Sequence, residues 1–318
     1  MREITYAEAG MEALVEELRR DPKTFELSTD AIPSLVDEFG KKRIRAAPIA
    51  ESAFTGMSIG AAGSGYRPIV NWRQITFAFV AMDQIVNQAA KIHYMFGGQQ
   101  TFPVTFRAAV GGGTKLAAQH SQSPYSMFMN LAGMKIILPS NPYDMKGLLK
   151  AAIRDNNPVI SFEANRLMGM RGQVPEGDYT VPIGVADVKR EGTDITVVAI
   201  AWMVPEALAA AEILEKEGVS VEVLDPRTLV PMDAETIRVS VQKTSRLLVA
   251  DEAGPTAGAS AEIISLVTED AKTFASLKAP VSRVCALEAP IPYSPVLEDH
   301  VFPNRERIAE GIRAAMST

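Results

Sequence analysis

The chain has little cysteine or histidine. A single cysteine, Cys285, and three histidines stand among 318 residues. One thiol excludes an internal disulfide framework and a cysteine metal cluster, and we expect it to be a small buried group. The histidines, His93, His120 and His300, lack the spacing of a catalytic zinc motif. The one G-x-S-x-G match, Gly56–Gly60, falls inside the small-residue stretch 49–65 that is predicted to be a helix, and not in the strand-to-helix turn that a nucleophilic serine needs. Zinc and serine-nucleophile chemistry are therefore not expected.

Long apolar runs and an excess of positive charge are also absent. No stretch reaches the roughly 18 uninterrupted apolar residues of a membrane helix. The N-terminus, Met1–Thr5, has neither an apolar signal core nor a transit-type composition. The net charge of −6, with both signs interspersed, argues against general affinity for nucleic acid. We therefore expect an intracellular protein, cytoplasmic if its source is bacterial, with no membrane or nucleic-acid partner.

The pattern that is present is an alternation of short apolar strands with helices. Apolar residues make up 47% of the chain, enough for a substantial core. Alternation of this kind is typical of a mostly parallel sheet covered on both faces by helices. The first set of strands is predicted near 25–28, 67–72, 103–107, 134–139 and 159–163, and the helices over 6–20, 49–65, 81–94 and 144–155.

A break in this alternation divides the chain. Glycine, proline and charged residues concentrate between Met170 and Asp194, which we interpret as an interdomain linker. Strands then resume at 195–201, 219–224 and 246–250, with helices over 205–218, 259–267 and 304–316. Asn304 is a suitable N-cap for the last helix. We predict two α/β domains, residues 1–185 and residues 186–318.

Two polar side chains are notable for their settings: Glu51 has small and apolar neighbours, and His120 stands among polar residues after a glycine loop. Glu51 lies in the segment Ala47–Ser52, and His120 follows a glycine run, Gly111–Gly113. A carboxylate and an imidazole in such settings suit acid–base chemistry. From position alone, a helix-capping glutamate and a structural or solvated histidine remain the simpler alternatives.

Longer segments, taken in order, resemble the pyrimidine-binding β subunit of thiamine diphosphate-dependent 2-oxoacid dehydrogenases. The similar segments are Pro48–Glu51, Asp83–Lys91, Ala117–Gln122, Arg154–Val159, Leu224–Asp233, Glu252–Glu262 and Pro292–Asp299. The resemblance that these ordered segments carry extends over nearly the whole chain. The family includes pyruvate, branched-chain 2-oxoacid and acetoin dehydrogenases. The resemblance implies a thiamine-type pyrimidine-binding domain followed by a smaller domain of the transketolase C-terminal type.

The resemblance also implies roles for individual residues. Glu51 matches the glutamate that hydrogen-bonds the aminopyrimidine ring of thiamine diphosphate. His120 matches the histidine that faces the substrate and the entering lipoyl group. Ile75 and Phe77 are the apolar residues left to pack on the ring, with ordinary core packing as the alternative.

A monovalent cation, usually potassium, is a further implication. The family holds it with backbone carbonyls and one aspartate, and oxygen ligands suit such a hard cation. The matching positions here are Val104, Ala152, Asp155 and Asn157. Asp155 is equally well explained as a residue of a helix C-terminal turn.

The diphosphate half of the family's site is missing from the chain. That half uses Gly-Asp-Gly and a later asparagine to hold Mg²⁺, and no such pattern occurs here. The resemblance therefore implies an α subunit that carries the Mg²⁺ ligands, in an α2β2 heterotetramer. The second domain is expected to contact a lipoyl acyltransferase core.

Three segments depart from the family. One is Gly111–Lys115, which replaces the asparagine- or glycine-alanine loop that usually precedes the histidine. The loop over residues 28–34 looks shortened, and Trp72–Ile75 replaces a more apolar stretch beside the aminopyrimidine. Arg73 or Gln74 is a candidate for recognising a polar group of the substrate, with a surface role as the alternative. These departures leave Glu51 and His120 in place and bear on the choice of substrate.

We therefore predict an enzyme that is active only with an α subunit. It is the β subunit of a thiamine diphosphate-dependent 2-oxoacid or acetoin dehydrogenase, which catalyses oxidative decarboxylation or cleavage and transfers the acyl group to a lipoyl carrier. One alternative is the β chain of a split transketolase or non-oxidative 2-oxoacid decarboxylase without a lipoyl acceptor. Another is a scaffold chain that has lost catalysis.

Overall fold

The computed structural model describes residues 1–317, which form two compact units. The first contains Met1–Val110 and Met127–Ile183, and the second contains Gly111–Ser126 and the chain from Gly184 onward. The domain limits 1–185 and 186–318 remain a prediction, and the compact units differ from them in grouping residues 111–126 with the second part. Within the described residues, no helix is long and apolar enough to span a membrane.

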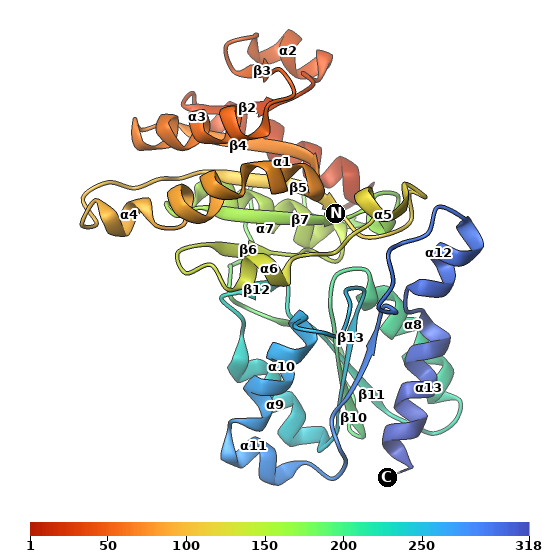
Figure 1. Cartoon of the computed structure of the whole chain (residues 1–318). Coiled ribbons are helices and arrows are strands. Elements are labelled where there is room, and N and C mark those ends of the chain that lie inside the picture. Colours follow the sequence, from red (N-terminus) through yellow and green to blue (C-terminus); the bar gives the residue numbers. More distant parts are fainter. Residues whose placement is uncertain (318) are drawn as a thin grey trace. The chain divides into compact units, whose positions relative to one another are not determined.

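The first unit is built on a parallel sheet (Figure 1). Its own strands run in the order β6-β7-β5-β4-β2-β3, and every neighbouring pair is parallel. The strands are β2 (Thr24–Ser28), β3 (Ile44–Ala46), β4 (Arg67–Gln74), β5 (Thr105–Val110), β6 (Lys135–Ile137) and β7 (Val159–Ala164). The strands predicted from the short apolar runs are confirmed, as burial on both faces of a parallel sheet requires.

Helices cover both faces of this sheet. On one face, α7 (Pro142–Arg154) lies against β5, where the Thr105 hydroxyl donates to the carbonyl of Ala152 at 3.2 Å. Helix α1 (Tyr6–Arg20) packs beside α7 and begins with a capping box between Thr5 and Glu8. On the other face, α3 (Glu51–Gly63) packs on β4. The first unit also contains a short antiparallel strand pair, β1 (Arg2–Thr5) with β8 (Arg171–Val174), and helix α2 (Pro33–Phe39).

The helix predicted over 81–94 is only partly right. The chain forms a 3₁₀ helix, η1 (Ile75–Ala81), a π-helical turn, η2 (Gln84–Ala89), and one α-helical turn, α4 (Ile92–Met95). The segment runs very close to α3, since a Cβ on Gly56 would lie 2.9 Å from the Gln84 side-chain oxygen. Packing against a neighbouring helix has thus replaced the regular α-helical ladder, as short 3₁₀ and π segments often do near functional sites.

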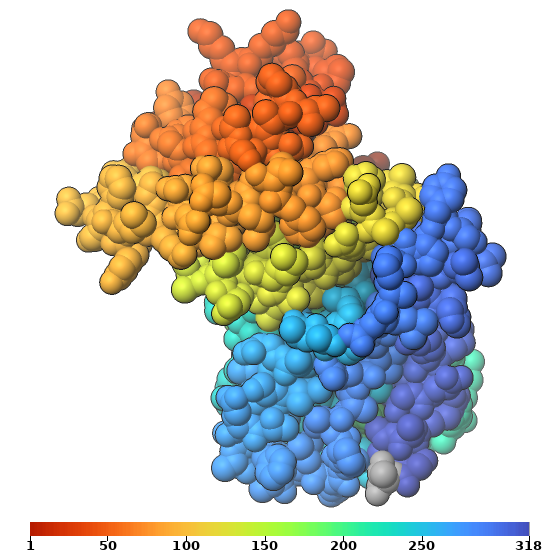
Figure 2. All heavy atoms as spheres, viewed as in Figure 1, coloured from red at the N-terminus to blue at the C-terminus, as the bar shows by residue number. Residues whose placement is uncertain are grey.

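A group of large apolar side chains stays exposed on the first unit. Helix α4 projects from it at the left of Figure 2, where Tyr94 is 86% exposed and Met95 and Phe96 are also exposed. Ile49 and Val80, beside the start of α3 and at the end of η1, are exposed too. Large apolar side chains that stay exposed in numbers are candidates for contact with another protein.

The second unit is a smaller α/β sandwich. Its sheet has the order β14-β13-β10-β11-β9, parallel except for β9, which runs antiparallel to β11. The strands are β9 (Asp187–Arg190), β10 (Ile195–Ala199), β11 (Val221–Asp225), β13 (Leu247–Asp251) and β14 (Ser282–Cys285). Strands β8 and β9 both fall inside the segment that we interpreted as a linker, so that segment is more regular than its composition suggested.

Helices also cover both faces of the second sheet (Figure 1). Apolar residues of α8 (Met203–Glu215) and α13 (Arg305–Met316) form one core with β10, β11, β13 and β14. Helices α9 (Ala234–Thr244), α10 (Ala259–Thr268) and α11 (Ala271–Ser276) pack together on the opposite face. Asn304 caps α13 by accepting a hydrogen bond from the Arg307 amide at 2.9 Å, and Cys285 is a free, buried thiol, as predicted.

Candidate active site

Glu51 is a buried carboxylate without a partner among residues 1–317. It is the first residue of α3, follows Ala50 at the N-cap, and is 7% exposed. Its side chain forms no hydrogen bond or ion pair within the described chain, so the helix-capping alternative is not observed. Buried carboxylates are normally hydrogen-bonded, because leaving one unpaired costs free energy. Glu51 is thus available to a ligand from outside this chain.

The elements around Glu51 are held by side-chain hydrogen bonds. The Ser52 hydroxyl donates to the carbonyl of Val80, which joins the start of α3 to the end of η1. One turn further along α3, the Thr55 hydroxyl accepts a hydrogen bond from the Trp72 indole at 3.0 Å. The Trp72 ring stacks on Phe106 with a centroid distance of 4.7 Å and an interplanar angle of 7°. The helix that carries Glu51 is therefore tied to both β4 and η1.

Helix η1 carries the two apolar residues that were predicted to pack on the aminopyrimidine ring. Ile75 is 2% exposed and belongs to the core. Phe77 is 37% exposed, so part of its ring is open to a ligand. Their proposed contact with a cofactor stays a prediction, and Phe77 is the better placed of the two.

A buried polar cluster lies on the opposite face of the same sheet. Arg107 pairs with Glu163 through two hydrogen bonds of 2.7 and 3.0 Å. Burial disfavours the guanidinium charge, but the field of Glu163 outweighs it and the pKa of Arg107 is raised. Burial raises the pKa of Glu26, although Arg107 and a hydrogen bond from Asn71 at 3.4 Å oppose the shift. This cluster fixes the middle of the sheet.

His120 belongs to the second unit, where it ends the one-turn helix α5 (Ala117–His120) and is half-buried. The glycine run before it is required by close contacts. A Cβ on Gly111, whose φ is 79°, would lie 2.4 Å from a Glu252 carboxylate oxygen, and one on Gly112 would lie 2.3 Å from the Phe302 ring. The Gly113 amide donates to Glu298 at 2.6 Å. The loop that carries His120 is therefore packed tightly within the second unit.

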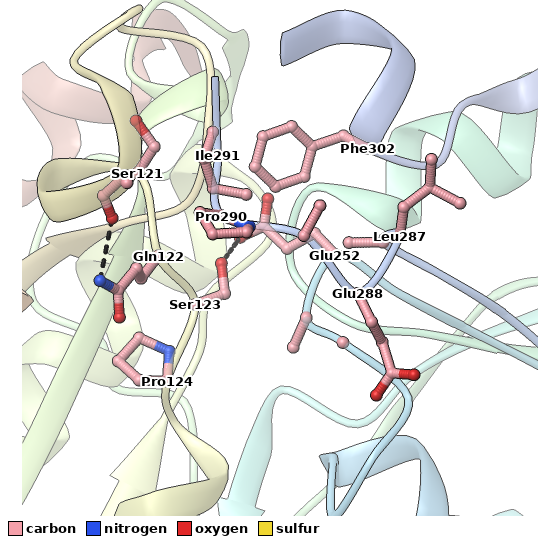
Figure 3. A pocket seen from close by; sticks show the side chains of 15 residues that line it. Ser121, Gln122, Ser123, Pro124, Glu252, Leu287, Glu288, Pro290, Ile291 and Phe302 are labelled. Carbon is pink, nitrogen blue, oxygen red and sulfur yellow. Dashed lines mark hydrogen bonds between the residues drawn. The ribbon is translucent and has the colours of Figure 1, made fainter. Parts of the chain in front are cut away.

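A cavity of about 470 Å³ lies next to this loop within the second unit (Figure 3). Ala118 and Ser121, which flank His120 closely in sequence, line it. Figure 3 shows Ser123 pointing toward Glu252, to which its hydroxyl donates at 3.0 Å, with Phe302 on the apolar side. Glu252 follows β13 directly, at the carboxyl end of a parallel strand, where ligand-binding groups of α/β folds gather. The sequence analysis named Glu252 only as the start of a similar segment and gave it no role. Its place just after a predicted strand, 246–250, was the signal that could have found it.

The four residues predicted to hold a cation converge on the turn between α7 and β7 of the first unit. The Ala152 carbonyl accepts hydrogen bonds from the Thr105 hydroxyl and from the Asp155 amide, both at 3.2 Å. The Val104 carbonyl accepts from the Val159 amide at 3.0 Å. Asp155 and Asn157 are joined because the Asp155 carboxylate accepts from both amide groups of Asn157.

Two basic residues already donate hydrogen bonds to this turn, and the sequence analysis predicted neither of them. Lys135 donates to the Asp155 carboxylate, and Arg67 donates to the carbonyls of Ile153 and Asp155 at 3.1 and 2.9 Å. Burial would raise the pKa of Asp155, but the bonds from Lys135 and Asn157 outweigh it and the pKa is lowered. A cation here would therefore meet carbonyl oxygens rather than an unpaired carboxylate, which fits a weakly held monovalent ion. The described residues contain no cluster of histidine, cysteine and carboxylate groups suited to a metal.

Comparison with known proteins accounts for this combination of elements. Residues 2–170 match the family model of the transketolase pyrimidine-binding domain, and residues 184–308 match that of the transketolase C-terminal domain. The chain is 42% identical to the β subunit of acetoin:2,6-dichlorophenolindophenol oxidoreductase from Cupriavidus necator, over 99% of this chain and 98% of that protein. The chain belongs to the β-subunit family of thiamine diphosphate-dependent acetoin and 2-oxoacid dehydrogenases.

Other members of this β-subunit family are similar over most of their length. The corresponding acetoin oxidoreductase subunit of Bacillus subtilis is 46% identical over 86% of this chain and 80% of its own length. The pyruvate dehydrogenase E1 component β subunit of Rickettsia felis is 39% identical over 98% of both chains. A solved split-gene transketolase, described as an inactive β4 tetramer, matches with a TM-score of 0.82 over 99% of this chain and 98% of that one, at 24% identity. The predicted family and fold are confirmed. Because the relatives are β subunits, an α partner is implied.

Proposed function

We propose that this chain, with an α subunit, forms the first component of a dehydrogenase complex that cleaves a small 2-oxoacid or acetoin and transfers the acyl group to a lipoyl carrier. The observation that carries this proposal is the buried, unpartnered carboxylate of Glu51 in a chain of the thiamine diphosphate-dependent family. Relatives named for acetoin, pyruvate and 2-oxoisovalerate support the range of substrates.

The residues of the first unit fit the pyrimidine half of thiamine diphosphate. When bound, that cofactor supplies the carbanion-stabilising centre of the reaction. Glu51 would accept a hydrogen bond from the aminopyrimidine ring, since its carboxylate is buried and has no donor within the described chain. The partly exposed ring of Phe77 would pack against that ring. His120 would hold or transfer a proton at the substrate.

The α subunit would complete the site. The chain lacks the Gly-Asp-Gly pattern of the diphosphate half, so we propose that the α subunit carries the Mg²⁺ ligands. The exposed apolar side chains of α4 and of Ile49 and Val80 would be covered by a subunit in the assembly. We propose an α2β2 heterotetramer that acts with a lipoyl acyltransferase core. A cytoplasmic location stays a prediction.

We also propose a potassium ion at the turn formed by Val104, Ala152, Asp155 and Asn157. Thr105, the residue after Val104, donates to the Ala152 carbonyl, so these two chain segments are adjacent, and oxygen ligands suit this ion. An ion present at ten times its dissociation constant would stabilise the folded complex by about 1.4 kcal/mol. We expect the melting temperature to be higher in potassium chloride than in choline chloride at equal ionic strength. Equal melting temperatures in the two salts would remove this ion from the proposal.

The proposal is tested by turnover of the complex with its α chain. With thiamine diphosphate and Mg²⁺ supplied, reduction of an artificial electron acceptor is followed across acetoin and a set of 2-oxoacids. We expect one compound class to be turned over, and the activity to disappear when the α chain is left out. A complex that binds the cofactor and turns over none of these compounds would contradict the proposed function.

A further inference from the structure

The carboxyl end of β4 carries two polar side chains that form no hydrogen bond or ion pair among residues 1–317. The guanidinium of Arg73 is exposed and forms no hydrogen bond or ion pair with the described chain. The side-chain carbonyl oxygen of the next residue, Gln74, is buried and has no donor. A buried amide oxygen without a donor is uncommon, so a group from outside this chain is expected to supply one.

The backbone holds Arg73 in an unusual conformation. Its φ is 68°, in the left-handed region that residues with a Cβ seldom adopt. The pairing of β4 with β5 shifts register between Asn71 and Gln74, which makes a bulge at this point. The Asn71 side chain accepts a hydrogen bond from the Arg73 amide at 3.0 Å and fixes the bulge. Bulges and left-handed residues of this kind concentrate at functional sites, where they direct one side chain.

The bulge adjoins the elements that carry the proposed cofactor contacts. Trp72, the residue before Arg73, donates to Thr55, which lies one turn after Glu51 on α3. The next element along the chain, η1, carries Phe77. In parallel α/β sheets, ligands bind outside the carboxyl ends of the strands, and Arg73 occupies that position on β4.

We propose that Arg73 binds a carboxylate of the substrate that is not lost in the reaction, which makes the substrate a 2-oxoacid with a second carboxylate. This inference rests on the proposed function. A guanidinium presents a rigid fork of donors that matches a carboxylate. It is unsuited to the carboxylate that leaves as carbon dioxide, because it would stabilise the ground state relative to the transition state. Binding a remote carboxylate instead contributes binding energy without opposing the chemistry.

The test compares two substrates of equal chain length. The complex of this chain with its α subunit is assayed with 2-oxopentanedioate and with 2-oxopentanoate, which differ only by the second carboxylate. We expect the wild-type complex to prefer the dicarboxylate. Arg73→Met should lower kcat/KM for the dicarboxylate by about 10- to 100-fold, chiefly through KM, and leave the monocarboxylate nearly unchanged. Arg73→Lys should restore part of the loss, since it keeps the charge but not the fork.

A matched variant removes the same charge elsewhere on the first unit. Lys41 is exposed. It precedes β3, so it lies toward the amino ends of the parallel strands, whereas Arg73 lies at the carboxyl end of β4. Lys41→Met should leave both substrates unaffected. Calorimetric titration of thiamine diphosphate into each variant complex should give the same affinity as wild type, which separates substrate recognition from cofactor binding.

Three outcomes would overturn the inference. The first is a wild-type preference for the monocarboxylate or for neutral acetoin. The second is an equal loss on both substrates in Arg73→Met, which would indicate a structural role. The third is a failure of the wild-type complex to turn over any 2-oxo compound, which would remove the proposed function as well. In the first two outcomes the proposed function stands and only the role of Arg73 falls.

Discussion

Two polar regions of the first unit differ in how their buried groups are satisfied. Between α1 and α7, the fully buried ammonium groups of Lys146 and Lys150 both contact Glu16, and Lys150 also pairs with Asp178. At the start of α3 and the end of β4, the buried residue Glu51 has a carboxylate with no partner among the described residues, and Gln74 has a buried side-chain oxygen with no donor.

This difference indicates what each region is for. Paired buried charges hold the two helices together, because each ion's loss of hydration is offset by its partner. Unpaired buried groups destabilise the isolated chain, and their presence is explained when a ligand or another subunit completes them. The substitutions below therefore should affect stability in the first region and function in the second.

The largest expected effect is on catalysis, from Glu51→Gln. The amide keeps the size of the side chain but removes the carboxylate that would accept a proton or a hydrogen bond from the cofactor. We expect kcat to fall about 10³-fold, equivalent to about 4 kcal/mol of barrier, with assembly intact. Steady-state assays of the complex measure the loss. Glu176→Gln, at an exposed residue that forms no hydrogen bond or ion pair within the described chain, is the matched control and should be silent. Full activity of the Glu51→Gln complex would refute the role of Glu51.

The next effect is on stability, from Lys146→Met. The ammonium of Lys146 contacts Glu12 at 3.3 Å and Glu16 at 2.6 Å. Both carboxylates are partly exposed, so water compensates them in part, and we expect a loss of about 2 to 4 kcal/mol in the free energy of unfolding. Urea denaturation measures the change. If the variant were as stable as wild type, the ion pairs of Lys146 would not contribute to the free energy of unfolding.

A smaller effect of opposite sign is expected from Arg73→Gly. Glycine adopts a φ near 68° without strain, so the free energy of unfolding should rise by about 1 kcal/mol. The preference for a second carboxylate should be lost at the same time. A variant that is less stable than wild type would show that the arginine side chain contributes to folding, contrary to its lack of partners.

The smallest effect is a change in pH dependence, from Glu26→Gln. Burial raises the pKa of Glu26 above the ordinary value of 4.5, so the folded chain binds this proton more tightly than the unfolded chain does. Stability from this group is therefore present at low pH and is lost as the pH rises through the folded-state pKa. Relative to wild type, the variant should gain stability as the pH increases above about 4.5. Thermal melts at several pH values would show it, and a gap between the two proteins that is independent of pH would contradict the assignment.

Periodicity and capping signals were sufficient for most of the secondary structure. The apolar spacing predicted α1 over its observed range, and Asn304 was correctly expected to cap α13. These features depend on residues close in the sequence, so local patterns are enough to detect them. The helix predicted over 81–94 was only partly right, because a π segment, Gln84–Ala89, interrupts it where the chain passes close to Gly56 of α3.

The sequence by itself determined the class of fold, the family and the residues worth testing. These depend on short-range periodicity and on the identity and order of the residues in the motifs. The tertiary structure decided which of those residues lack partners. The sequence allowed Glu51 to be a helix cap, and it allowed Arg73 to form an ion pair. The packing of α3, β4 and η1 instead leaves Glu51 buried without a partner and places Arg73 on a bulge. The physical reason is that hydrogen-bond and ion-pair partners of buried groups come from distant parts of the chain.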